Sequence, residues 1–383
     1  MRLQLTARGR ASRAVALAAS AVLALPALAA APARAQVGGD GEQATATAGL
    51  RVYADDDRVT VWSPSARAAT PLPRGLAVEV TTTIDAVTAA SIDVVATASP
   101  YAFTETRVEG GVAVGLAVAP YQQAAVRAIV SDERDFTALR LGGGWRAELA
   151  ERNTTLELTA MVGLDTVGRA GDPGFARDRR ELRLGAALTQ ITDRRGYVDA
   201  VLEAVAQRGY LASPYRFVPV ELGAAVYHLP ERVPDERTGV AALVRGRRAV
   251  GARTFVHLDY RLGRDTWAIT SHTATARAAR SLRADEVVVG LEARGYLQGA
   301  ASFHRARYLD DGGAPAWRTR DRTLGRMASA TTAALVEARL PWAELRVAAS
   351  AAWVRFWWRD DPLQARRDAV IASLSLLVPL RSP

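Results

Sequence analysis

Apolar and polar residues alternate along this chain in segments of about ten residues, and the pattern recurs from Leu50 almost to the end. The clearest segment is 138–149, where Leu139, Leu141, Trp145, Ala147 and Leu149 alternate with Arg140, Gly142, Gly144, Arg146 and Glu148. Because successive side chains of a β-strand point to opposite faces, each segment predicts a strand with one apolar and one polar face. Such strands suit a barrel whose outer face meets lipid and whose inner face encloses a polar lumen.

The first 35 residues have the composition of a secretory signal peptide. Four arginines between Arg2 and Arg13 precede an apolar stretch from Ala14 to Ala30, and Ala33-Arg34-Ala35 has the A-x-A form of a cleavage site. Pro26 and the small residues at the exit argue against a membrane-anchoring helix. We therefore expect export with cleavage before Gln36, then a flexible leader over residues 36–49 and a barrel domain over residues 50–383.

The charge of the exported part argues against nucleic-acid binding. The whole chain has a formal net charge of +9, but residues 1–35 carry five arginines and no acidic residue, which leaves 44 arginines against 40 acidic residues, or +4. Lysine and cysteine are both absent. Every cation is therefore a guanidinium, and packing and hydrogen bonds must stabilise the fold without disulfides.

The sequence after residue 35 contains no credible transmembrane helix. Its longest uncharged run, between Glu109 and Arg127, is interrupted by glycines and Pro120 and is shorter than the ~20 residues that a spanning helix needs. An exported chain of this kind is either a soluble periplasmic β-protein or an outer-membrane barrel. The repeated alternation favours the barrel.

We predict an all-β fold, a transmembrane antiparallel up-and-down β-barrel of about 14 strands, within a range of about 12 to 16. The predicted strands are 75–86, 107–118, 123–131, 138–149, 154–165, 179–191, 197–208, 237–249, 253–262, 267–278, 285–297, 325–338, 344–357 and 367–380. Alternation is weakest in 197–208, where Val201 and Val205 share a face with Asp199 and Glu203.

The predicted connections alternate in length, as they do in outer-membrane barrels with short periplasmic turns and longer outer loops. With the N-terminus in the periplasm, the periplasmic connections are 119–122, 150–153, 192–196, 250–252, 279–284 and 339–343, all short. The outer connections include four long ones, 87–106, 166–178, 209–236 and 298–324, and shorter ones at 132–137, 263–266 and 358–366.

Aromatic residues near the predicted strand ends are consistent with interfacial girdles, although aromatics also cap the cores of soluble β-sandwiches. They are Tyr197, Trp267, Trp342, Trp357 and Trp358. The chain ends Leu380-Arg-Ser-Pro383 instead of with an aromatic residue. We expect the barrel-assembly machinery to recognise 374–380 as the last strand segment.

Charged residues on the polar faces of these strands are the candidate functional set, because they would line the lumen. They are Arg140, Arg146, Glu148, Glu157, Arg183, Glu203, His257, Asp259, Arg261, Glu292 and Arg294. Opposed rows of arginines and carboxylates would impose a field across a pore and tune its selectivity. The alternative is that cross-lumen ion pairs fill and rigidify a closed barrel.

Other constellations give no catalytic residue, metal site or cofactor. Asp55-Asp56-Asp57, Asp310-Asp311 and Asp360-Asp361 fit no EF-hand spacing and are interpreted as solvated acidic loops. The four histidines lack zinc-protease spacing. Ser271 and His272 point to opposite faces of one strand and cannot form a nucleophile–base pair, so we interpret His272 as a lumen histidine.

The glycine run 142–144 is followed by neither a lysine nor a helix start, which excludes a phosphate-binding loop. It is better explained by crowding in a barrel wall or by a bulge.

Five phrases in order resemble the outer-membrane β-barrel family catalogued as domain of unknown function 3570. They are Asp85-Ala-Val-Thr-Ala-Ala-Ser-Ile-Asp93, Ser131-Asp-Glu-Arg-Asp-Phe136, Arg152-Asn-Thr-Thr155 running on to Asp165, Gly209-Tyr-Leu-Ala-Ser-Pro-Tyr-Arg216, and Leu229-Pro-Glu-Arg-Val-Pro-Asp-Glu-Arg-Thr238. The resemblance covers roughly residues 50–380, and it implies a one-domain barrel without implying any catalytic residue.

We expect a non-enzymatic protein of a Gram-negative outer membrane, in contact with membrane lipid and acting as a porin-like channel or uptake protein for small polar solutes. Two other functions stay open. One is a closed structural barrel that binds partners through 209–236 and 298–324, and the other is an outer-membrane lipid hydrolase.

Overall fold

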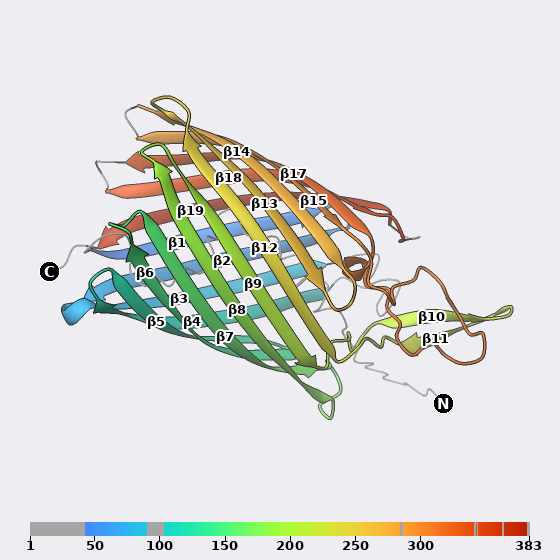
Figure 1. The fold of residues 1–383 in the computed structure, drawn as a ribbon. Helices are drawn as coiled ribbons and strands as arrows, with labels where there is room; N and C mark the ends of the chain where they lie inside the picture. The colour runs from blue at the N-terminus through green and yellow to red at the C-terminus, as the bar shows by residue number, and fades with distance from the viewer. Residues whose placement is uncertain are drawn as a thin grey trace, which may run out of the picture.

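Sixteen antiparallel strands close into one barrel in the computed structural model, which describes residues 43–89, 103–283, 286–340, 342, 344–361 and 364–380 (Figure 1). Around the wall the order is β1-β2-β3-β4-β5-β6-β7-β8-β9-β12-β13-β14-β15-β17-β18-β19, and β19 pairs with β1. The predicted fold class is confirmed, and the count is 16 where about 14 strands were predicted. Among the described residues, no helix is long and apolar enough to cross a bilayer.

The barrel strands are β1 (Ala44–Asp55), β2 (Val59–Leu72), β3 (Leu76–Ala89), β4 (Phe103–Ala119), β5 (Gln122–Glu133), β6 (Phe136–Leu149), β7 (Thr154–Gly168), β8 (Ala176–Asp193), β9 (Gly196–Gly209), β12 (Glu236–Ala249), β13 (Thr254–Asp265), β14 (Thr270–Leu282), β15 (Val287–Gln298), β17 (Met327–Leu340), β18 (Leu345–Trp358) and β19 (Arg366–Leu380). All fourteen predicted strands correspond to members of this set. Most predicted strands are shorter at one or both ends, since the strands continue beyond the apolar belt into the polar loops.

The two strands that were not predicted, β1 and β2, complete the barrel between β19 and β3. The predicted boundary at residue 50 lies inside β1, which begins at Ala44, so the last six residues of the predicted leader form part of the wall. Large apolar residues are sparse in β1, and β2 contains Pro64 and Pro71. Proline in a strand interior usually argues against that strand, which explains why the pattern did not indicate β2.

The strand connections differ in length at the two ends of the barrel. At the short-turn end, neighbouring strands are joined by segments such as 120–121, 150–153 and 194–195. At the opposite, long-loop end, 210–235 and 299–326 join β9 to β12 and β15 to β17. This is the asymmetry that the sequence predicts.

The outward face of the wall is apolar and exposed. Leu291, Leu202 and Val126 are 70%, 64% and 63% exposed. They are part of a belt that also includes Leu141, Leu158, Val162, Leu184, Val240, Val244 and Leu258. Contiguous apolar surface on this scale is not stable in water, and it fits contact with acyl chains.

The two longest loops fold together into one unit at the long-loop end (Figure 1). It contains a three-stranded sheet of β10 (Phe217–Leu222), β11 (Ala225–Pro230) and β16 (Tyr308–Leu309), in the order β11-β10-β16. Val218, Val220 and Tyr308 form its core. A second core joins both loops to the β13–β14 connection; it contains Ala212, Val233, Trp267, Ile269, Ala301 and Leu324. We call residues 210–235 and 299–326 the long-loop unit.

Candidate functional site: the barrel interior

The eleven predicted lumen residues all lie at the inward positions of their strands, on the face opposite the exposed apolar belt. In β6, for example, Leu141 is exposed and outward, whereas Arg140 lies inward, 3.8 Å from Glu109 of β4. The others are Arg146, Glu148, Glu157, Arg183, Glu203, His257, Asp259, Arg261, Glu292 and Arg294. The interior also contains many charges that the prediction did not include.

Opposite walls of the lumen have opposite charge. Strands β3 to β5 form the acidic wall, which contains Glu79, Asp85, Glu105, Glu109 and Glu133 against Arg107 and Arg127. Strands β12 to β15 form the basic wall, which contains Arg237, Arg245, Arg247, Arg261, Arg277, Arg294 and His257 against Asp259, Asp265 and Glu292. Four strands separate the walls on one side and five on the other, so they face each other across the barrel.

Ion pairs link strands that are not hydrogen-bonded to each other. Arg261 of β13 reaches over β12 to Glu203 of β9 at 2.9 Å, and Arg127 of β5 reaches over β4 to Glu79 of β3 at 3.3 Å. These contacts run along the wall, and they hold the arginine side chains in defined positions above it. Preorganised charges of this kind are what a selective pore requires.

A row of small residues creates a hollow in the wall between the acidic and basic sides. Ala125, Gly144, Thr159 and Gly185 are register partners on β5 to β8 and all face inward. They adjoin a cavity of about 300 Å³ whose lining includes Arg127, Glu157, Arg183, Glu203 and Arg261. The run 142–144 therefore relieves crowding within a regular strand: a Cβ on Gly142 would lie 2.8 Å from the carbonyl oxygen of Ala160.

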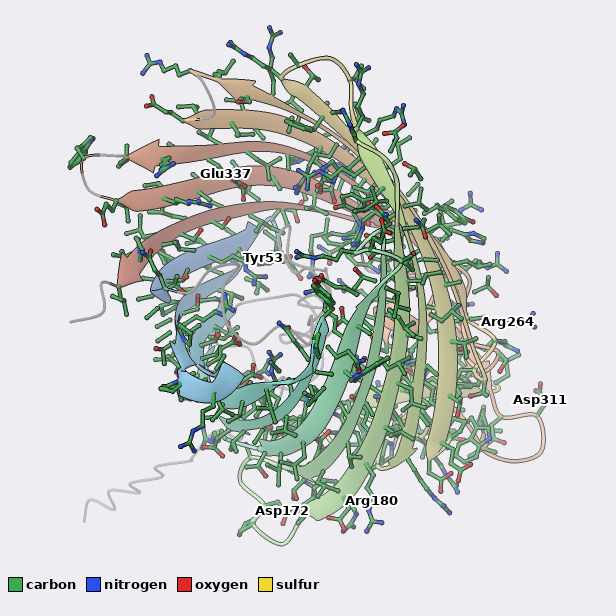
Figure 2. The ribbon with its side chains drawn as sticks, turned by 60° about the vertical axis from the view of Figure 1, so that its left-hand side comes forward. Tyr53, Asp172, Arg180, Arg264, Asp311 and Glu337 are labelled. Carbon is green, nitrogen blue, oxygen red and sulfur yellow. The ribbon has the colours of Figure 1, made fainter. Side chains whose placement is uncertain are left out.

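The remaining wall, from β17 to β2, is largely apolar near the long-loop end. Tyr53, Val61, Val354, Phe356 and Trp358 form a buried cluster inside the barrel there, and Figure 2 shows Tyr53 on the inner side of the N-terminal strands. This cluster narrows the interior from one side.

The acidic triplet 55–57 borders this cluster, and the interpretation of it as a solvated loop was wrong. Asp55 and Asp57 are buried and both pair with Arg367 of β19, Asp55 at 3.3 Å. Arg367 also stacks over Trp358, 5.5 Å from the ring centroid. The ion pairs join the first strand to the last strand, across the point where the barrel closes.

The long-loop unit is fixed by buried charges. Arg216 contacts Glu231 at 2.9 Å and Asp321 at 3.0 Å, which ties 210–235 to 299–326. Burial alone would raise the pKa of Asp321, but the Arg216 guanidinium and hydrogen bonds from Thr323 outweigh it and hold the pKa below its usual value. In the same unit, burial lowers the pKa of His304, an effect that nearby carboxylates, Asp360 first, oppose.

Three carboxylates meet where the acidic wall ends at the long-loop side. Oxygens of Glu105, Glu133 and Asp135 lie within 4.8 Å of one another. Arg107 is 3.5 Å from Glu133, and the Tyr215 hydroxyl donates a hydrogen bond to Asp135. The group has the oxygen chemistry of a hard-cation site, but its charge is already partly neutralised by the arginine. The sequence reasoning missed it because its members come from β4, β5 and a turn.

His272 does not lie in the lumen, and that interpretation was wrong. It faces outward, where its Nδ1 lies 2.7 Å from the Tyr260 hydroxyl, while Ser271 faces inward. The two side chains lie on opposite faces, as strand geometry requires.

The aromatic prediction holds only in part. Trp342 and Trp357 are exposed near strand ends, but Trp267 of the β13–β14 connection is buried against the long-loop unit and Trp358 inside the barrel. Tyr197 faces inward. Proximity to a strand end did not distinguish an interfacial side chain from one that packs inside.

The closed ring of strands, the exposed apolar belt and the charged interior define a transmembrane β-barrel with the fold of outer-membrane proteins. The family described as "Protein of unknown function (DUF3570)" matches residues 172–349, which confirms the predicted resemblance. Two of the five phrases, 209–216 and 229–238, lie inside the matched range. A search of curated proteins found no match.

Solved structures with a similar fold are outer-membrane barrels of low sequence identity. A bacterial polysaccharide outer membrane secretin is 8% identical, with a TM-score of 0.52 over 89% of this chain and 99% of its own. OccK1 (OpdK) of Pseudomonas aeruginosa is 11% identical, with a TM-score of 0.45 over 89% and 100%. The siderophore receptor PirA of the same organism is 11% identical, with a TM-score of 0.45 over 82% of this chain; the chain spans 56% of that receptor. At these identities the similarity concerns the fold alone.

Proposed function

We propose that the protein is a passive channel for small polar solutes in the outer membrane of a Gram-negative cell. The observation that carries this proposal is the placement of an acidic wall opposite a basic wall, beside a cavity of about 300 Å³. Ion pairs within each wall hold the charges in place, so the interior provides a fixed transverse field. A barrel whose only task was structural would gain more from an apolar or fully cross-linked filling.

The location and the route of export belong to the same proposal. The apolar belt needs lipid, and residues 1–35 have the form of a signal peptide. We also propose that the protein acts without catalysis, since its charged groups are arranged as extended rows of ion pairs along the wall. The outer-membrane lipid and the barrel-assembly machinery are its expected partners.

Conductance in planar lipid bilayers tests the channel. Purified protein should give discrete steps of ion conductance at constant amplitude per insertion. Boiled protein, which no longer holds the barrel, is the matched control and should give none. The absence of steps from correctly folded protein would remove the proposal.

A second candidate function is a partner-binding platform, and the long-loop unit favours it. The unit has its own sheet and two cores, and it exposes Leu222, Val226 and Leu309, which are 55%, 57% and 55% exposed. Replacing these three residues by serine should reduce recovery of a partner after cross-linking on intact cells, without changing conductance. An unchanged cross-linking pattern would count against this function.

A further inference from the structure

In most ion pairs of the lumen the arginine is more exposed than its carboxylate; the exceptions are the pairs of Glu109, Asp259 and Glu203. The Arg183 side chain is 55% exposed and its partner Glu181 only 7%; for Arg67 and Glu79 the values are 42% and 7%. The difference follows from side-chain length, because a short carboxylate stays beside the backbone while the long arginine extends over it. At pairs such as these, a solute in the lumen meets the guanidinium group and not the carboxylate.

The cavity beside β5 to β9 concentrates these exposed guanidiniums. Arg127, Arg183 and Arg261 line it from three different strands, together with the carboxylates of Glu157 and Glu203. Arg183 contacts Glu181 through Nε and also lines the cavity. Glu203 is the exposed acid of the set, and its 46% exposure is similar to the 41% of Arg261.

The floor of the cavity is made of small and apolar groups. Gly142, Gly144, Gly185, Ala187 and Val201 line it and leave room that larger side chains would fill. At about 300 Å³ the cavity is near the lower limit for small-molecule sites. Its dimensions thus suit a short carbon skeleton with a charged end.

We propose that this cavity is a binding subsite for small carboxylates, with the solute oxygens on Arg183 and Arg261 and the carbon skeleton against the small residues. The inference rests on the proposed function, because the solute reaches the cavity through the lumen. Planar guanidinium groups match the two oxygens of a carboxylate. The small and apolar residues in the lining can contact a carbon skeleton, which inorganic phosphate lacks, so a carboxylate is the better ligand.

The test compares four probes: succinate, its uncharged diamide succinamide, 1,4-diaminobutane and inorganic phosphate. Binding to the folded protein in detergent is measured by calorimetry, and permeability by reversal potentials in bilayers. Succinate should bind in preference to the diamide and the diamine, and it should permeate in preference to the diamine. R183Q and R261Q should each weaken succinate binding about tenfold, the loss expected for one charge-assisted hydrogen bond. E203Q should strengthen it.

Two outward arginines on the same strands provide matched controls. Arg180 of β8 and Arg264 of β13 point away from the barrel in Figure 2, each three residues from the arginine tested. R180Q and R264Q should leave succinate binding unchanged. A general effect of lost positive charge, or of altered folding, would appear in these variants too.

The outcomes separate this inference from the channel proposal. Conductance without preference for succinate, or equal effects of R183Q and R180Q, would overturn the subsite and leave the channel standing. Folded protein that binds succinate but gives no conductance would support the subsite and remove the channel. Phosphate binding tighter than succinate binding would overturn the assignment to carboxylates.

Discussion

The contribution of a charged residue to the stability of this barrel depends on whether its ion pair is buried or exposed. Arg367 is the clearest case, because its side chain is 9% exposed while Asp55 and Asp57 are 0% and 2% exposed. Removing one member of a buried ion pair leaves the other charges without compensation, at a cost far above that of losing a surface pair. Asp55 and Asp57 of the acidic triplet therefore stabilise the contact between the first and last strands through Arg367.

We expect Arg367→Met to destabilise the barrel by about 3–5 kcal/mol, the range for breaking a buried ion pair. Guanidinium unfolding in lipid vesicles, followed by tryptophan fluorescence, measures the change. Arg366→Met is the control, because Arg366 is exposed on the same strand. Equal stability of the two variants would show that the ion pairs contribute little.

Small inward side chains set the width of the lumen beside the cavity. Ala187 of β8 lines the cavity, whereas Leu182 of the same strand is outward and 41% exposed. Ala187→Phe should lower single-channel conductance measurably by filling part of the cavity, and Leu182→Phe should not. Equal conductance of Ala187→Phe and the unmodified protein would place the conduction path elsewhere.

At the scale of the element, the docking of the long-loop unit on the barrel depends on the protonation of buried groups. His304 is buried and its pKa lies below the usual value, so the docked unit favours the neutral imidazole. An undocked histidine takes up a proton as the pH falls below about 6.5. Protonation therefore favours the undocked form, and docking weakens as the pH falls through that value.

Hydrogen exchange at pH 7.5 and pH 5.5 checks this pH dependence. After correction for the intrinsic exchange rate, amides in 210–235 and 299–326 should be less protected at pH 5.5. His304→Gln should abolish most of the difference, because Asp321, whose pKa is lowered by Arg216 and Thr323, stays charged at both values. The same pH response in this variant would assign the effect to another group.

Elements with strong alternation were predictable from the sequence, and those stabilised by distant contacts were not. Segment 138–149 corresponds to β6 within two residues, because lipid and lumen impose the pattern directly. The proline-containing β2 is held by pairing with β1 and β3, which no local pattern indicates. The long-loop unit is likewise fixed by contacts such as that between Arg216 and Asp321, which are 105 residues apart.

The candidate site shows the same division. Strand parity alone placed eleven charged residues on the inward face, but the opposition of the two walls depends on the strand order around a closed ring. Without β1 and β2, which the sequence pattern did not indicate, a different set of strands would lie opposite each wall. In pairs such as Arg183 with Glu181, the side-chain lengths then determine that a solute meets the arginine. Only the positions of both partners show this.

At the scale of the whole molecule, one property connects the fold with the proposed function: neighbouring residues of each strand face different media. The chain contains no cysteine, so single cysteines can be introduced without background. Positions 182 to 185 of β8 sample both faces, since Leu182 and Leu184 are outward whereas Arg183 and Gly185 line the cavity.

Labelling of these four single-cysteine variants in lipid vesicles, with a water-soluble maleimide, tests this property most directly. We expect rapid labelling at 183 and 185 and slow labelling at 182 and 184. Quenching of an attached fluorophore by a lipid-soluble quencher should show the reverse order. Uniform labelling at all four positions, or protection of 183 and 185, would contradict a barrel with an aqueous interior.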